Sequence, residues 1–270
     1  MSYISDFKST AIGLFSQGTS NATGTGIVEP DLSTAVGQKF LTSDGREVAL
    51  VQNGTVALVS GVLVQAPAIV ANHQHLAVSV STVSAAAGTN QISVTLGATL
   101  LTTNQYAGGY AVVDSGTGIG QTLRIASNPN SAASGSVVIT LEDNIVTTLD
   151  ATSTVCLIPN LYKNVIISPT TFTNAVVGVT LYPVAASVAP TTDGTTGKQT
   201  AAGTAQYAFI QTKGLVSCLS DATVAAVGLG ITPSSTTAGC ITVATATGTN
   251  IGRAVQTSVS AQARTIFVDL

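Results

Sequence analysis

The sequence predicts an all-β protein with a sandwich or barrel architecture, most simply two β-domains with the middle one inserted into the other. Three observations lead to this fold class. Short segments alternate polar and apolar residues with a period of two, and residues typical of tight turns separate them. No capped apolar stripe of helical period runs for more than about three turns. Many short strands separated by turns characterise sandwiches and barrels.

The first strands are expected between residues 40 and 83. Glu47–Val51 is apolar enough for a buried strand, and Asn53-Gly54 is the strongest short hairpin signal. We therefore expect residues 55–59 to return antiparallel to it. Residues 61–65 and 76–83 continue the pattern as further strands.

The central stretch, residues 88–144, carries the clearest alternation. Ile92, Val94 and Leu96 share one face of an expected strand, and Val137–Leu141 repeats the pattern. In the strand between them, Leu123 and Ile125 are expected inward and Thr122 and Arg124 outward. The remaining strands are expected at residues 153–159, 164–168, 176–182, 206–211, 214–219, 238–243, 251–256 and 264–270.

The domain organisation follows from this distribution of strands. Residues 37–75 and 206–270 are expected to form one discontinuous β-domain, because neither block alone has enough strands to close a sandwich. Residues 76–205 are expected to form the inserted β-domain, with strands up to residue 183. Residues 184–205 are small and polar and predict a long exposed loop.

Residues 1–36 are expected to form an N-terminal arm. Six apolar side chains precede a segment rich in Gly and Thr and have no nearby partner in the sequence. They are candidates for contact with another subunit or another protein, and a flexible tail with a short helical turn is the alternative. These candidate interaction residues are Tyr3, Ile4, Phe7, Ile12, Leu14 and Phe15.

The chain has very few charges. Apolar residues make up 45% but charged residues only 8%, against a usual share of about 25%. No Asp, Glu, Lys or Arg occurs from Val48 to Val113. Since free-standing soluble proteins keep scattered charge, this depletion indicates a surface that packs against partners. The net charge of −3 without a Lys/Arg cluster argues against nucleic acid as a partner. The apolar run at 56–71 is too short and too interrupted for a membrane span, so no membrane partner is expected.

Sequence motifs for catalysis, cofactors and metals are missing. His73 and His75 would share a face of a strand, but no further ligand is visible near them, so a polar strand edge is the preferred interpretation and no metal is expected. The three cysteines are scattered and indicate buried free thiols. Asp114, Glu142 and Asp143 could supply a carboxylate pair, but a chain without Trp lacks the usual sugar platform. We expect no enzyme, no catalytic residues and no cofactor.

Five segments carry a resemblance to a known family. Glu47–Val51, Asn53–Ala57 and Gly61–Pro67 look like the opening strands of tailed-bacteriophage capsid decoration proteins, also called cement or head-stabilisation proteins. Tyr207–Gly214 and residues 251–270 are similar to their closing strands.

The resemblance implies a non-enzymatic virion protein that is assembled in the host bacterial cytoplasm. Such a protein binds the outer surface of an icosahedral capsid and stabilises it. Its partners would be the major capsid protein and itself, as a homotrimer, since trimers suit three-fold positions. The alternative is a tail-fibre or receptor-binding β-protein that recognises a host surface glycan, and a secreted hydrolase is a third, weaker class.

Overall fold

The computed structural model describes residues 36–80, 85–221, 226–244, 250–259 and 262–270. Within these residues the fold is all-β, as predicted, and the only helical element is the 3₁₀ turn η1 (Ala71–His73). No helix in this part of the chain is long and apolar enough to cross a membrane.

The chain divides into two compact units. The terminal unit contains residues 36–67, Leu161–Val188 and Thr204–Leu270, and the inserted unit contains Ala68–Asn160 and Ala189–Gly203. Each unit has its own sheet and its own buried apolar core.

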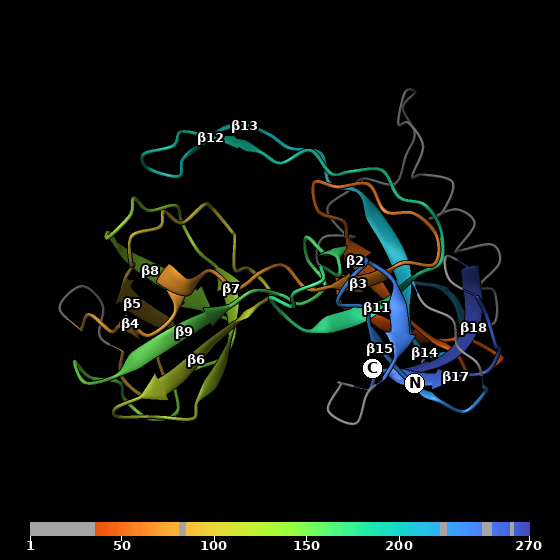
Figure 1. Ribbon diagram of the computed structural model, residues 1–270. Helices are drawn as coiled ribbons and strands as arrows, with labels where there is room; N and C mark the ends of the chain where they lie inside the picture. The colour runs from red at the N-terminus through yellow and green to blue at the C-terminus, as the bar shows by residue number, and fades with distance from the viewer. Residues whose placement is uncertain (1–35, 81–84, 222–225, 245–249, 260–261) are drawn as a thin grey trace. The chain divides into compact units, whose positions relative to one another are not determined.

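The inserted unit is a six-stranded antiparallel sheet in the order β4-β9-β6-β7-β8-β5 (Figure 1). A bridge between Val78, just after β4, and Val94 in β5 joins the two ends of this order. This bridge brings the two end strands of the sheet together at one point and shortens its open edges. The strands are β4 (Leu76–Ala77), β5 (Gln91–Thr95), β6 (Tyr110–Ser115), β7 (Thr122–Ser127), β8 (Ser136–Leu141) and β9 (Thr154–Ile158).

The faces predicted for the central stretch are confirmed. The side chains expected inward, among them Ile92, Val94, Leu123 and Ile125, are at most 3% exposed, and Arg124 points to solvent. Together with residues from β4, β6 and β9 they form one continuous core.

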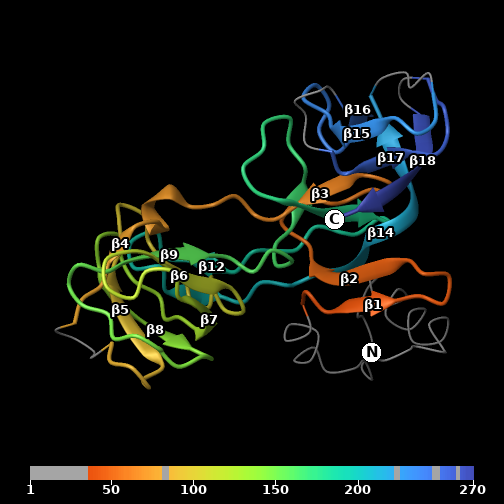
Figure 2. The same ribbon diagram turned by 90° about the horizontal axis from the view of Figure 1, so that it is seen from below.

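The terminal unit is organised around the 14-residue strand β14 (Tyr207–Ser220). Its first half pairs with β2 and β11, and its second half pairs with β18 (Figure 2). Pairings β14-β16-β15-β17-β18-β14 close a ring of five strands around a second core. The other strands are β1 (Lys39–Leu41), β2 (Glu47–Gln52), β3 (Leu63–Gln65), β10 (Ile166–Ile167), β11 (Val176–Thr180), β15 (Gly230–Pro233), β16 (Ile241–Val243), β17 (Gly252–Ala254) and β18 (Gln262–Asp269).

The sequence predicted two strands where β14 is one. The expected break at residues 212–213 is a register shift between Gln211 and Lys213 in the pairing with β2. Gly214, with φ +98°, follows this irregularity and lets the strand bend without ending. The bend allows one strand to pair with β2 in its first half and to take part in the closed ring in its second half.

The hairpin predicted at Asn53-Gly54 is wrong. β2 pairs with β1 and β14, and Gly54 lies against the backbone of Val165 instead of turning the chain. The Asn53 side-chain amide donates hydrogen bonds to the carbonyl oxygens of Val56 and Ala185. The bond to Ala185, 132 positions along the chain, holds this segment in a path other than a hairpin. A tertiary contact thus overrides a local turn signal.

The boundaries expected for the inserted domain also need correction. The expected inserted domain, residues 76–205, includes residues 161–188, but these belong to the terminal unit, where β10 pairs with β3 and β11 pairs with β3 and β14. Strand periodicity cannot reveal this, because it reports which residues face a core and not which core they face.

The segment expected as a loop at residues 184–205 contains a hairpin of β12 (Thr191–Thr192) and β13 (Gln199–Ala201). The hairpin belongs to the inserted unit, and its turn is held there by a hydrogen bond from the Asn130 side-chain amide to the Thr196 carbonyl oxygen. Gly197 lies so close to the Leu101 carbonyl oxygen that a Cβ there would be 2.3 Å from it. A tightly docked turn of this kind differs from the exposed linker that the composition predicted.

Candidate functional site

The candidate interaction residues Tyr3, Ile4, Phe7, Ile12, Leu14 and Phe15 lie outside the described residues. The arm therefore stays a prediction. Within the described part of the chain, one group brings together three different kinds of metal-binding or reactive side chain, namely His75, Asp114 and Cys156.

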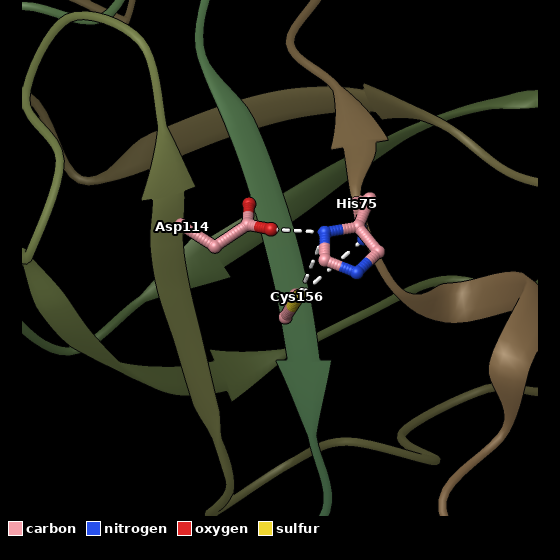
Figure 3. Close-up of side chains that lie close together, drawn as sticks. All are labelled: His75, Asp114 and Cys156. Carbon is pink, nitrogen blue, oxygen red and sulfur yellow. Dashed lines mark hydrogen bonds and ion pairs between the residues drawn. The ribbon is translucent and has the colours of Figure 1, made fainter.

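Three chain segments of the inserted unit position this group (Figure 3). His75 directly precedes β4, Asp114 lies in β6 and Cys156 lies in β9. β9 is hydrogen-bonded to both other strands, so residues 39 and 81 positions from His75 in the sequence become its neighbours.

A β-bulge aims Asp114 at the group. The pairing of β6 with β9 shifts between Val113 and Ser115, which leaves Asp114 as the extra residue. Bulges redirect a side chain out of the regular alternation and are common next to functional sites. On β9, Val155 and Leu157 belong to the core, so the alternation turns Cys156 towards the opposite face.

The contacts within the group are close. His75 Nδ1 is hydrogen-bonded to Asp114 Oδ2, and the same nitrogen lies 3.9 Å from Cys156 Sγ. The His75 backbone N–H donates to this sulfur at 3.4 Å. His75 has φ +54°, a left-handed conformation that His adopts more readily than most residues, and one that tends to persist where surrounding contacts hold it.

Asp114 has a second, well-defined partner. The Thr154 hydroxyl donates to Asp114 Oδ1 at 2.6 Å and also contacts the Ser115 hydroxyl at 2.7 Å. Partial burial favours the neutral carboxyl, but the hydrogen bonds from Thr154 and His75 outweigh it, and the pKa of Asp114 is lowered. The carboxylate is thus the form present at neutral pH.

The thiol of Cys156 is not activated by its surroundings. Burial raises its pKa, the nearby Asp114 carboxylate adds to this effect, and the His75 N–H opposes it. The side chain is 9% exposed. A protonated, nearly buried thiol is a weak nucleophile.

The geometry of the group does not match a nucleophilic triad. In a triad one imidazole nitrogen faces the nucleophile and the other faces the carboxylate. Here both Asp114 and Cys156 approach Nδ1 of His75, so this nitrogen cannot relay a proton between them. One nitrogen, one carboxylate oxygen and one sulfur within 4.8 Å of one another are, however, a plausible set of ligands for a single metal ion.

The two histidines do not share a face, contrary to the expectation from their spacing. His73 ends the 3₁₀ turn and is fully buried, whereas the His75 side chain is 77% exposed. His73 Nε2 lies 3.1 Å from the Thr99 carbonyl oxygen, which can only accept, so Nε2 carries the proton. The bare Nδ1 then accepts the hydroxyl proton of Tyr106 at 2.8 Å. Burial lowers the pKa of His73 and keeps this arrangement neutral.

Only part of this group could be found from sequence patterns. Cys156 alternates with two apolar residues on its strand, which already indicates that its side chain leaves the core. No sequence pattern reveals the register that sets Asp114 beside His75, because that pairing depends on a bulge. All three cysteines are free and buried, which confirms the prediction of buried free thiols.

Comparisons with protein-family models, with curated proteins and with solved structures give no match to this chain.

Proposed function

We propose that this chain is a non-enzymatic structural protein of a bacteriophage virion that binds the outer surface of the capsid and stabilises it. One observation carries the proposal. The segments that resemble decoration proteins contribute β2, β3, β14, β17 and β18, and these strands belong to a single hydrogen-bonded sheet in the terminal unit. Segments that are distant in the sequence thus pair within one folded unit. This is what we expect if the segments descend together from one ancestral domain.

The surface of the terminal unit supports binding to another protein. Leu215 on β14 and Phe267 on β18 are cross-strand partners and are 50% and 42% exposed. Exposed Phe and Leu side chains at one spot are typical of the apolar centre of an interface. Lys213 and Asp269, the next exposed pair along the same strands, form an ion pair beside them.

Capsid stabilisation follows from binding by mass action. A protein that bridges neighbouring capsid subunits favours the assembled shell by an amount that grows with occupancy and affinity. Because the surface has few charges, binding should depend mainly on apolar and backbone contacts and should vary little with ionic strength.

The test uses capsids of the virus whose genome encodes this chain, prepared without the protein. Adding the purified full-length protein should saturate a fixed number of sites per capsid and raise the temperature at which the capsids release DNA. Phe267→Ser should weaken binding at least tenfold. Ile119→Ser, an equally drastic change at a 66% exposed position of the inserted unit, should leave binding unchanged.

Two outcomes would overturn the proposal. One is the absence of saturable binding to capsids at micromolar concentration. The other is location of the protein at the tail tip of native virions, together with binding to host-cell glycan, which would establish the receptor-binding alternative.

A further inference from the structure

A second property is encoded in the inserted unit, at the group His75, Asp114 and Cys156. We propose that these side chains bind a divalent transition-metal ion, with zinc as the preferred ion. The imidazole Nδ1, one carboxylate oxygen and the thiolate sulfur would be its three protein ligands. Metal binding at this site does not depend on capsid binding.

The distances suit a tetrahedral ion. Zinc bonds of about 2.0–2.3 Å place neighbouring ligand atoms roughly 3.3–3.6 Å apart. Nδ1 of His75 and Sγ of Cys156 are 3.9 Å apart, close to that separation. Nδ1 and Asp114 Oδ2 share a hydrogen, and the two atoms would move apart as the metal takes the place of that proton. The neutral imidazole would then carry its proton on Nε2, on the side away from the ion.

The polar groups around the ligands already hold them in place. The Thr154 hydroxyl binds Oδ1 of Asp114 and leaves Oδ2 for the ion. The His75 backbone N–H points at the sulfur and would stabilise a thiolate there. Hydrogen bonds of this kind orient metal ligands and tune their donor strength.

The fourth position would be taken by water. The His75 side chain is 77% exposed, so solvent reaches the group at its imidazole. Three protein ligands and an open position are the arrangement of zinc sites that keep a water ligand. The Cys156 thiol loses its proton on binding, and the proton goes to solvent.

The ligand set decides between classes of ion. A sulfur and an imidazole favour zinc and its transition-metal neighbours, whereas magnesium and calcium require oxygen ligands throughout. The site should therefore bind Zn²⁺ and Co²⁺, and Mg²⁺ in large excess should not displace them.

The position of the ligands predicts a structural effect. The three ligands come from the segment before β4, from the bulge of β6 and from β9. A bound ion would link the segment that precedes β4 to the strands β6 and β9 of the inserted unit. It should therefore raise the unfolding temperature of this unit, because the unfolded chain does not preserve the site.

The experiment titrates metal-free full-length protein, under reducing conditions, with Zn²⁺ by calorimetry and with Co²⁺ by absorption spectroscopy. We expect one ion per chain and a thiolate-to-cobalt charge-transfer band. Cys156→Ser should abolish the band, whereas Cys240→Ser, at a thiol that is also 9% exposed but lies in the terminal unit, should retain it.

Two further variants keep the test decisive if Cys156→Ser impairs folding. His75→Asn preserves a residue type that tolerates positive φ and should lower zinc affinity at least tenfold. Thr154→Val keeps all three ligands but removes the hydrogen bonds that the Thr154 hydroxyl makes with Asp114 and Ser115, and it should lower zinc affinity about 10–100-fold. The proposal is overturned if zinc does not bind, if Mg²⁺ competes on equal terms, or if His75→Asn, Thr154→Val and Cys156→Ser all bind zinc like the parent protein.

Discussion

Replacing Tyr106 by Phe tests the buried hydrogen bond that holds His73, at the end of the 3₁₀ turn η1, against the rest of the inserted unit. The Tyr106 hydroxyl donates to His73 Nδ1 at 2.8 Å, and the two residues are 1% and 0% exposed. Water has no access to replace the lost donor, and the imidazole cannot turn to use its other nitrogen because Nε2–H is bound to the Thr99 carbonyl oxygen.

The expected loss of unfolding free energy follows from the burial of both side chains. Leaving a buried acceptor without a partner costs about 1–3 kcal/mol, whereas the lost apolar contact is small because Phe keeps the ring. The ring itself packs edge-on against the imidazole at a centroid distance of 5.6 Å, and Phe retains that contact. For a unit of this size each kcal/mol lowers the Tm by roughly 4–8 °C.

The assay is thermal and urea unfolding followed by near- and far-ultraviolet circular dichroism. Tyr110→Phe is the matched control, because Tyr110 lies in the same unit and is 43% exposed, so that solvent can hydrate the groups around it. A loss below about 0.5 kcal/mol for Tyr106→Phe, or a loss no larger than that of Tyr110→Phe, would refute the reasoning.

Three further predictions concern charge, backbone and the arm. The hydrogen bond from Lys39 lowers the pKa of Glu47, so Glu47→Gln should cost less than about 1 kcal/mol at pH 7. This difference should vanish as the pH falls through the lowered pKa, because the bonded carboxylate stabilises the fold only while ionised. Gly116→Ala should destabilise the inserted unit far more than Gly120→Ala in urea unfolding. Both glycines have positive φ, but a Cβ at Gly116 would be 2.1 Å from a backbone carbonyl oxygen, and at Gly120 it would meet nothing. Deletion of residues 1–20 should leave the unfolding transitions unchanged and weaken self-association measured by light scattering, or binding to capsids. A loss of folding would instead make the arm part of the core.

The elements were predictable because each strand carries its own pattern. Alternation in β7 and β8 depends on one buried face, and the structure has that face as expected. In β5 the apolar residues are buried as expected, but Ser93 between them is buried as well. The unity of β14 was not predictable, since Gly214 predicts an interruption in isolation and becomes a bend only when β2 and β18 pair on either side of it.

The assignment of elements to units, and the candidate site, depend on contacts that a linear pattern does not carry. β10 and β11 have the same apolar signature in either unit, and only their pairing with β3 decides the matter. Arg264 illustrates the same limit. The sequence places it in a strand, yet the side chain is 1% exposed and donates to the Ser220 hydroxyl at 2.6 Å across the β14–β18 pair.

The placement of the few charges has a physical logic that links the fold to the proposed function. A surface with so little charge has weak protection against association through open strand edges. In the inserted unit one bridge joins β4 to β5 at the two ends of the six-stranded sheet, and part of the terminal unit closes the ring through β14 and β18. Among the described strands, β1 pairs only with β2, and its hairpin holds a concentration of charge in two ion pairs, Lys39–Glu47 and Asp44–Arg46. The charged side chains thus lie at the β1 edge, where another chain could add a strand. Apolar side chains such as Phe267 are exposed on the face of a sheet. The ion pairs at β1 therefore discourage edge pairing at that strand, while the exposed sheet face at Leu215 and Phe267 remains available for contact with another protein.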